Sequence, residues 1–166
     1  MKKLFLIALT AVFLSSCSNE GGKPNFGHSG TWEVVEVQNS WTGEVTPASE
    51  LSYSESYELR GNMTFTKFNS HLGIDLTGTY QEVELEEVEG SNDVLGFILS
   101  FDPEPIEKAK EVIESEVSIL INNDPFYFAV YGIDLQESLR IRRDGSMINS
   151  GHGIMDGPIY IYQKNK

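Results

Sequence analysis

The strongest constraint on the fold is an alternation of apolar and polar side chains with a period of two residues. In the segment 94–101, the apolar side chains of Leu95, Phe97, Leu99 and Phe101 fall on one face of an extended chain. Comparable segments follow one another along the sequence, and Gly, Asn, Asp and Pro interrupt them roughly every ten residues, as in all-β domains. The pattern predicts an all-β domain with about nine strands.

Local signals define several of these strands. The adjacent Val34 and Val35 break the alternation within an expected first strand over 32–38 and indicate a bulge. Gly61-Asn62 predicts a two-residue hairpin turn of the primed type, because both residues tolerate positive φ, and Asp144-Gly145 predicts a second hairpin. Further strands are expected over 53–60, 63–68, 72–77, 80–88, 94–101, 117–121, 126–133 and 158–163, with Gly78 separating 72–77 from 80–88.

One segment has helical rather than strand periodicity. Ile106, Ala109, Ile113 and Val117 recur at helical spacing among Glu and Lys, which predicts a single amphipathic helix beginning at Pro105. Short connections and strands with one polar face favour an antiparallel up-and-down barrel, because closing a sheet removes its exposed edges. A β-sandwich is the alternative.

The N-terminus has the signs of an export signal. Lys2 and Lys3 precede the segment 4–14, which is apolar except for Thr10 and too short to cross hydrocarbon roughly 30 Å thick. Leu14-Ser15-Ser16-Cys17 follows directly and resembles the lipobox of bacterial lipoproteins. That resemblance implies lipid attachment at Cys17 and cleavage before it; the alternative is an incidental cysteine after an ordinary signal peptide.

These signals predict three regions. Residues 1–16 are the signal peptide, residues 17–30 are a flexible tether rich in Gly, Ser and Asn, and residues 31–166 are the β domain. The protein is expected in the bacterial cell envelope, held to a membrane by its lipid. By analogy with enteric bacteria, Ser18 after the cysteine points to the outer membrane.

The charge of the chain excludes one class of partner. There are 25 acidic and 12 basic side chains, a formal net charge of −13, whereas nucleic-acid binding depends on Lys and Arg that neutralise phosphates. The charge is uneven, with −18 over residues 17–139 and +3 over residues 140–166. A single cysteine also excludes an internal disulfide.

Short motifs across the domain resemble the small bacterial lipocalin-like lipoproteins. They are Gly30-Thr31-Trp32, Tyr57 before the Gly61-Asn62 turn, Met63-Thr64-Phe65 after it, and Gly78-Thr79-Tyr80. The resemblance implies an eight-stranded barrel whose first-strand tryptophan closes one end. It also implies that Arg140 or Arg142 packs over this tryptophan.

Aromatic side chains from different strands are the candidate ligand-binding residues. Inward-facing members of this set would line a barrel cavity around a small apolar or amphipathic molecule. A filled barrel core is the alternative. The candidates are Tyr57, Phe65, Tyr80, Phe97, Phe126 and Phe128.

The sequence marks no catalytic group. Glu82, Glu84 and Glu86 would share one face of a strand, and such neighbouring glutamates are typical of a solvated surface rather than of paired catalytic carboxylates. His152 with Asp156 could form a metal site in space, although a solvent-facing loop histidine is the simpler interpretation. We expect no enzyme activity, no cofactor and no metal.

Two functions are therefore carried forward. The first is a membrane-anchored lipocalin-like lipoprotein that binds a small apolar or amphipathic ligand. The second is an interaction protein, of the inhibitor or immunity type, that binds a basic protein partner through its acidic face.

Overall fold

The computed structural model describes residues 27–86, 89–115, 135–150 and 158–166. The described strands are β1 (Gly30–Gln38), β2 (Val45–Pro47), β3 (Glu55–Leu59), β4 (Thr64–Asn69), β5 (Ile74–Val83), β6 (Asp93–Phe101), β7 (Gln136–Arg142), β8 (Met147–Asn149) and β9 (Ile159–Lys164). The short 3-10 helix η1 (Ala48–Glu50) and the helix α1 (Pro103–Ser115) complete the described elements.

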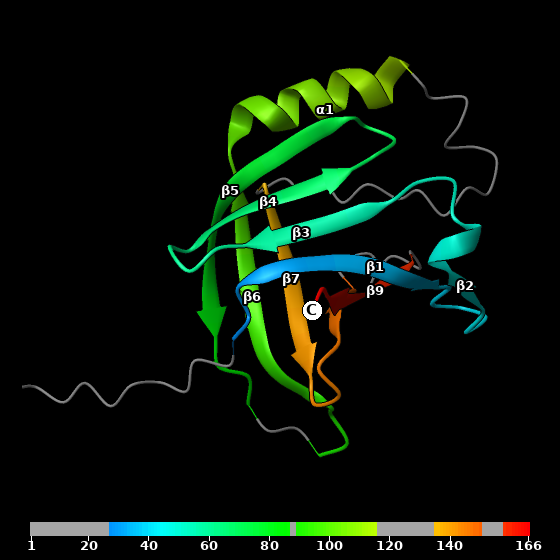
Figure 1. Cartoon of the computed structure of the whole chain (residues 1–166), viewed down its shortest axis with the longest axis vertical. Coiled ribbons are helices and arrows are strands. Elements are labelled where there is room, and N and C mark those ends of the chain that lie inside the picture. Colours follow the sequence, from blue (N-terminus) through cyan, green and yellow to red (C-terminus); the bar gives the residue numbers. More distant parts are fainter. Residues whose placement is uncertain (1–26, 87–88, 116–134, 151–157) are drawn as a thin grey trace, which may run out of the picture.

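The strands form one antiparallel sheet that closes on itself. Their order is β2-β1-β3-β4-β5-β6-β7-β8-β9, and β1 also pairs with β9. This pairing makes an eight-stranded barrel with the short β2 outside the ring (Figure 1). The expected antiparallel up-and-down barrel is confirmed, and the β-sandwich is wrong because the two end strands hydrogen-bond each other.

The bulge expected in the first strand is present. The pairing of β1 with β9 shifts its register between Val34 and Glu36. Val34 and Val37 are both buried, although three positions separate them, because the extra residue at a bulge resets which side chains face inward. The bulge thus lets β1 follow the curvature of the barrel.

Gly78 does not end a strand, so that expectation is wrong. β5 runs through Gly78, which pairs with Phe65 of β4 on one side and Phe101 of β6 on the other. A Cβ atom at Gly78 would lie 2.1 Å from the Ser100 carbonyl oxygen and 2.8 Å from the Phe65 ring. The ring of Phe65 packs edge-on against Phe101, with centroids 5.0 Å apart, and no side chain fits beneath it at Gly78.

Both predicted hairpins form, but the first turn is of a different type. Between β3 and β4, the Met63 N–H donates to the Arg60 carbonyl, and the positive φ of 62° falls on Met63 rather than on Gly61 or Asn62. Between β7 and β8, the Gly145 N–H donates to the Arg142 carbonyl with φ of 84° at Gly145. Each turn is therefore closed by an i to i+3 hydrogen bond, and the left-handed residue is the i+3 residue itself.

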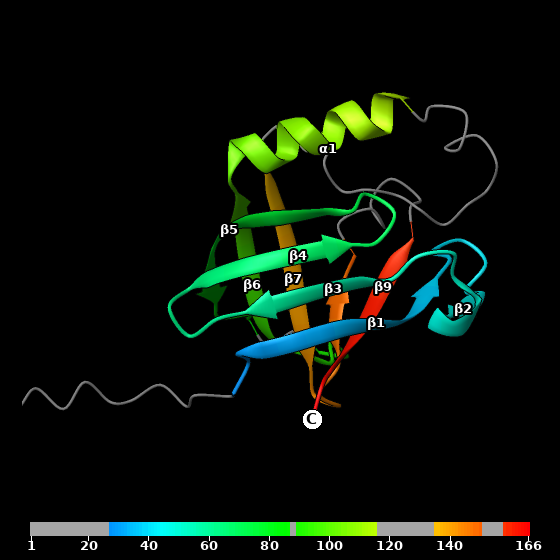
Figure 2. The same ribbon diagram turned by 45° about the horizontal axis from the view of Figure 1, so that its top comes forward.

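The helix α1 begins at Pro103, two residues before the expected start, and proline suits the first turn because its missing N–H would have no partner there. Ile106 and Ala109 are fully buried and belong to the core, as the helical spacing predicted. α1 lies along β5 at one side of the barrel (Figure 2). The strands expected over 117–121 and 126–133 lie outside the described residues.

Candidate functional site

The inner surface of the barrel has an apolar end and a polar end. Glu55 opens β3 opposite Asn69 of β4, whereas Leu59 closes β3 opposite Phe65. All four side chains are buried. The polar end carries a set that we call the buried network: Glu55, Tyr57, Lys67, Asn69, Glu137, Asn149 and Tyr162.

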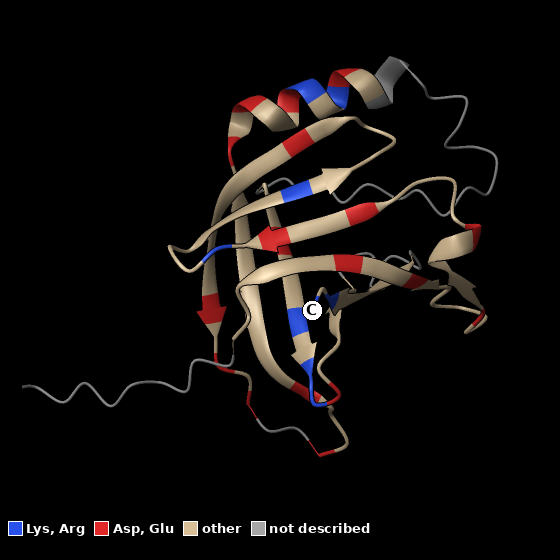
Figure 3. Cartoon of the chain, viewed as in Figure 1, with Lys and Arg blue, Asp and Glu red and all other residues tan. Residues whose placement is uncertain are grey.

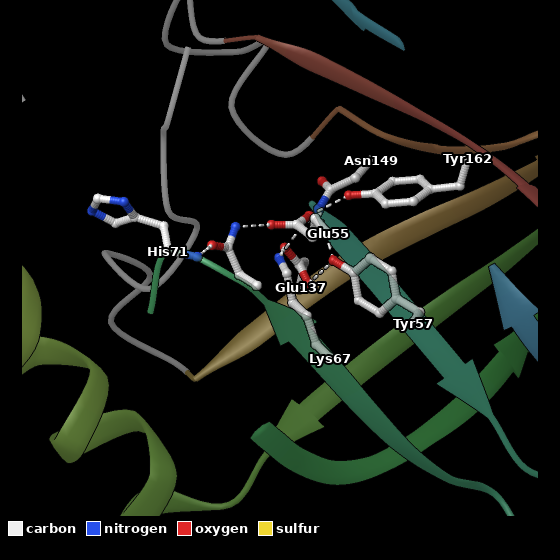
Figure 4. A network of polar contacts seen from close by, with 8 residues as sticks. Glu55, Tyr57, Lys67, His71, Glu137, Asn149 and Tyr162 are labelled. Atoms are coloured by element: carbon white, nitrogen blue, oxygen red, sulfur yellow. Dashed lines mark hydrogen bonds and ion pairs between the residues drawn. The ribbon is translucent and has the colours of Figure 1, made fainter. Parts of the chain in front are cut away.

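Ion pairs form the centre of the buried network. The Lys67 Nζ atom lies 2.9 Å from Glu137 Oε1 and 3.5 Å from Glu55 Oε1. The three side chains are at most 5% exposed, so water screens their charges little. Figure 4 shows both carboxylates converging on the ammonium group from different strands. Lys67 also lies 5.0 Å from the centroid of the Tyr57 ring, within range of a cation–π interaction.

Hydrogen-bond donors surround both carboxylates. The Tyr57 hydroxyl donates to Glu137 Oε2 at 2.5 Å, and Asn149 Nδ2 donates to Glu137 Oε1 at 2.6 Å. The Tyr162 hydroxyl donates to Glu55 Oε1, and Asn69 Nδ2 donates to Glu55 Oε2 at 2.9 Å. This arrangement is typical of ionised carboxylates, because their oxygens accept and cannot donate.

The pKa values follow from burial and from these partners. Burial alone would raise the pKa of Glu137, but the charge of Lys67 and hydrogen bonds from Tyr57, Lys67 and Asn149 outweigh it and lower that pKa. Burial alone would lower the pKa of Lys67, but the charges of Glu137 and Glu55 raise it. Both members of the central pair are therefore held in their ionised forms.

The two tyrosines of the buried network remain protonated donors. Burial, followed by the charges of Glu137 and Glu55, raises the pKa of Tyr57 well above 10.0. Burial and the charge of Glu55 do the same for the pKa of Tyr162. The two rings pack edge to face, with centroids 5.1 Å apart. The hydroxyls thus act as fixed hydrogen-bond donors toward the carboxylates.

The predicted ligand-binding residues divide between described and undescribed parts of the chain. Tyr57, Phe65, Tyr80 and Phe97 are all buried in the core cluster. Tyr80 packs edge-on against Phe97 with centroids 5.6 Å apart, and its hydroxyl donates to the Arg60 carbonyl. Phe126, Phe128 and Cys17 lie outside the described residues, as do His152 and Asp156. Ligand contact by the aromatic set stays a prediction.

The apolar end is covered by the residues that precede β1. Trp32 Nε1 donates to the His28 carbonyl at 2.9 Å, and the buried His28 ring lies edge-on to Phe97 at 5.4 Å. Burial, with a smaller contribution from Lys164, lowers the pKa of His28 and outweighs the opposing effect of Glu82. His28, which the sequence placed in the tether, therefore packs against the barrel as a neutral side chain.

The basic residue beside Trp32 is not one of the two arginines that the resemblance implied. Lys164 of β9 pairs with Trp32, and its ammonium group donates to the Gly27 carbonyl. Arg140 instead forms an ion pair with Asp93 of β6 at 2.8 Å. Arg142 lies 4.0 Å from the same carboxylate. The expectation for Arg140 and Arg142 is wrong, because these residues alternate with the buried Leu139 and Ile141 and so lie on the outer face of β7, whereas Trp32 is buried.

The glutamate run lies on the surface, as expected. Glu82, Glu84, Glu86 and Glu89 are exposed, but β5 ends at Val83, so the run continues past the strand that was expected to carry it. Figure 3 shows acidic residues spread over β1, β3, β5 and α1, and basic residues on β4, β7 and α1. Within the described ranges, no group of three or more His, Cys, Asp or Glu is arranged to hold a metal ion.

Sequence reasoning missed the charged members of the buried network. Lys67 and Asn69 lie two and four positions after Phe65, and Glu55 lies two positions before Tyr57, so all of them face the interior with those aromatic residues. Glu137 has the same relation to the buried Leu139. The signal that could have found them was the two-residue strand periodicity, which assigns these charged residues to the inward-facing positions.

Comparisons with protein-family models, with curated proteins and with solved structures found no match to this chain. In the described part of the chain, no helix is long and apolar enough to cross a membrane. The fold and the site together define a class: a closed eight-stranded antiparallel β-barrel with an ion-pair network buried inside it.

Proposed function

We propose that this chain is a lipid-anchored binding protein of the bacterial cell envelope, which holds a small amphipathic molecule in its barrel and performs no chemistry on it. The barrel fold is compatible with this function. The lipid anchor at Cys17 and the outer-membrane location rest on the lipobox resemblance of residues 14–17.

One observation carries the proposal: the closed barrel has an apolar end, which contains aromatic side chains, and a polar end, which contains the buried network. Burying three charged groups costs several kcal/mol per ion before their attraction is counted, and an apolar filling of the same volume is often equally stable or more stable. Stability alone therefore does not account for Glu55, Lys67 and Glu137. An amphipathic ligand, with an apolar body and a polar group, would use both ends.

The test is ligand retention by the full mature chain. Protein purified in mild detergent would be extracted with organic solvent, and the extract analysed by mass spectrometry. We expect a small amphiphile at near-equimolar amount, and displacement of bound N-phenyl-1-naphthylamine by that compound. A chain that carries no small molecule and does not bind this neutral fluorescent probe would refute the proposal.

A second function is favoured by the exposed glutamates. Glu82, Glu84 and Glu86 present a concentrated negative charge to solvent, which suits a basic protein partner. Salt-sensitive capture of such a partner, lost when the three become Gln, would support this function. The matched control replaces Glu104, Glu107 and Glu111 of α1 by Gln, which removes the same charge elsewhere.

A further inference from the structure

The buried network contains one more negative than positive charge. Glu55 and Glu137 are paired with a single ammonium group, that of Lys67. Among the described residues, Lys67 is the one buried Lys or Arg; Arg60, Lys108, Lys110, Arg140, Arg142, Arg143, Lys164 and Lys166 are partly or fully exposed. The described residues inside the barrel therefore carry a formal charge of −1.

The rest of the domain offers little to neutralise this charge. Within the β domain, the undescribed segments 87–88, 116–134 and 151–157 contain no lysine or arginine, and His152 is their one histidine; Lys23 belongs to the undescribed residues before the domain. His28 is buried at the apolar end, near Phe97, and its pKa is lowered. Because an uncompensated charge in a low-dielectric interior is expensive, a cation from outside the chain would stabilise the folded barrel.

The two carboxylates also retain acceptor capacity. An ionised carboxylate offers about four lone-pair positions. Glu137 accepts from Lys67, Asn149 and Tyr57, and Glu55 accepts from Lys67, Tyr162 and Asn69. In each carboxylate the Oε2 atom accepts one of these donors and Oε1 accepts two. The chemistry that fits is a positively charged group with N–H donors.

We propose that the ligand of this barrel is an amphipathic amine, whose ammonium group binds at Glu55 and Glu137 beside Lys67. This inference rests on the proposed ligand-binding function and names the ligand class. Tyr57 already holds one ammonium group, that of Lys67, over its ring at 5.0 Å. The buried aromatic side chains at the apolar end, Phe65, Tyr80 and Phe97, would contact the apolar part of this ligand.

The experiment compares three probes of one length on the full mature chain: octylamine, octanol and octanoate at pH 7.5. Binding would be followed by displacement of N-phenyl-1-naphthylamine. We expect octylamine to bind at least about tenfold more tightly than the other two, a difference of about 1.4 kcal/mol. Equal binding of octylamine and octanol would overturn the amine inference and leave the proposed function standing. If neither the probes nor the fluorescent reporter binds, the amine inference and the proposed ligand-binding function are both refuted.

The charge argument is tested by Glu55→Gln and Glu137→Gln, each of which brings the buried network to a formal charge of zero. Either substitution should reduce the preference for octylamine over octanol to about twofold or less. The matched control is Glu58→Gln, which removes the same charge from the outer face of β3 and should leave the preference intact. A preference that survives both interior substitutions would overturn the inference even if one variant folds poorly.

The same measurements distinguish an amine ligand from two other sources of positive charge, a metal ion and a cationic group of the chain itself. If sodium chloride abolishes the octylamine preference and an equal concentration of choline chloride does not, the site holds a metal ion instead of an amine. If the preference is absent in the wild type but present in His152→Gln, the chain supplies its own cation. Either result would overturn the inference.

Discussion

Lys67 and Glu137 are separated by 70 positions in the sequence, and their side chains lie 2.9 Å apart inside the barrel. The pair joins β4 to β7, which are not neighbours in the sheet. It therefore spans the interior of the barrel instead of reinforcing a hydrogen-bonded ladder. The following predictions begin from this relationship.

Replacement of Lys67 by Met should strongly destabilise the fold. The substitution leaves Glu55 and Glu137 buried without a cation, and removal of one partner from a buried ion pair typically costs about 3–5 kcal/mol. Urea unfolding would measure the loss. Lys108→Met on the exposed face of α1 is the control and should leave the unfolding free energy nearly unchanged. A loss at Lys67 no larger than at Lys108 would show that the buried network adds nothing to stability.

The stability contributed by the central pair should fall at both extremes of pH. Because the pKa of Glu137 is lowered from 4.5, its contribution is present above about pH 4.5 and disappears as the pH falls through the folded-state value. Because the pKa of Lys67 is raised from 10.5, its contribution is present below about pH 10.5 and disappears as the pH rises through the folded-state value. Urea midpoints measured against pH should show the acid decrease shrink in Glu137→Gln. If stability falls equally at low pH in that variant, the loss does not come from protonation of Glu137.

As the pH falls, protonation of His28 should cause a separate and smaller decrease in the stability of the fold. Its pKa is lowered from 6.5 by burial, so the folded state disfavours the protonated ring. The contribution is present above pH 6.5 and falls as the pH drops toward the folded-state pKa. In His28→Asn this step should be missing from the pH profile. His71→Asn, at a partly exposed loop position, is the comparison and should retain the step.

The two hairpin turns predict substitutions of opposite sign. Met63 has φ of 62°, a left-handed conformation that costs a non-glycine residue about 1 kcal/mol, and its side chain is exposed. Met63→Gly should therefore raise the unfolding free energy by about 0.5–1 kcal/mol. Gly145→Ala, at φ of 84° with open space around the new methyl group, should lower it by about 1 kcal/mol. Urea or thermal unfolding would measure the change in unfolding free energy of each variant. Changes of the same sign in the two variants would contradict this account.

Lipid attachment should depend on Cys17. We expect a metabolically supplied fatty acid to label the wild type and to be absent from Cys17→Ser, which should leave the membrane fraction. Ser16→Ala is a matched neighbouring control and should still be labelled. Label in Cys17→Ser would exclude acylation at the cysteine sulfur, which is the attachment that the lipobox resemblance implies.

The barrel class, the bulge at Val34 and the inward face of β6 could be predicted from the sequence, because each depends on a local alternation. The route of β5 through Gly78 could not, because it depends on where Phe65 and the Ser100 carbonyl lie in neighbouring strands. The turn type at Met63 was also missed, since the Gly61-Asn62 pair suggested a shorter loop than the one that forms.

The candidate site was only half predicted, for a related reason. Tyr57 and Phe65 were chosen because they are aromatic, and both are buried. Lys67 and Glu137 were passed over because charged side chains are usually exposed. Their burial depends on partners that are far away in the sequence, and no local pattern reports such partners. The strand periodicity placed these residues on the inner face, and that periodicity was the better guide.

The pairing of β1 with β9 also has a consequence for biosynthesis. β1 is the first strand of the domain to be made, and β9, which completes its hydrogen bonding at Tyr160 and Tyr162, is the last. During that interval β1 presents an unsatisfied edge, which is a template for pairing with another nascent chain. The mature barrel has no such edge on that side of β1, so the greatest danger of aggregation falls before the last strand is in place. A chaperone that shields β1 until then would raise the yield of folded protein without touching the finished molecule.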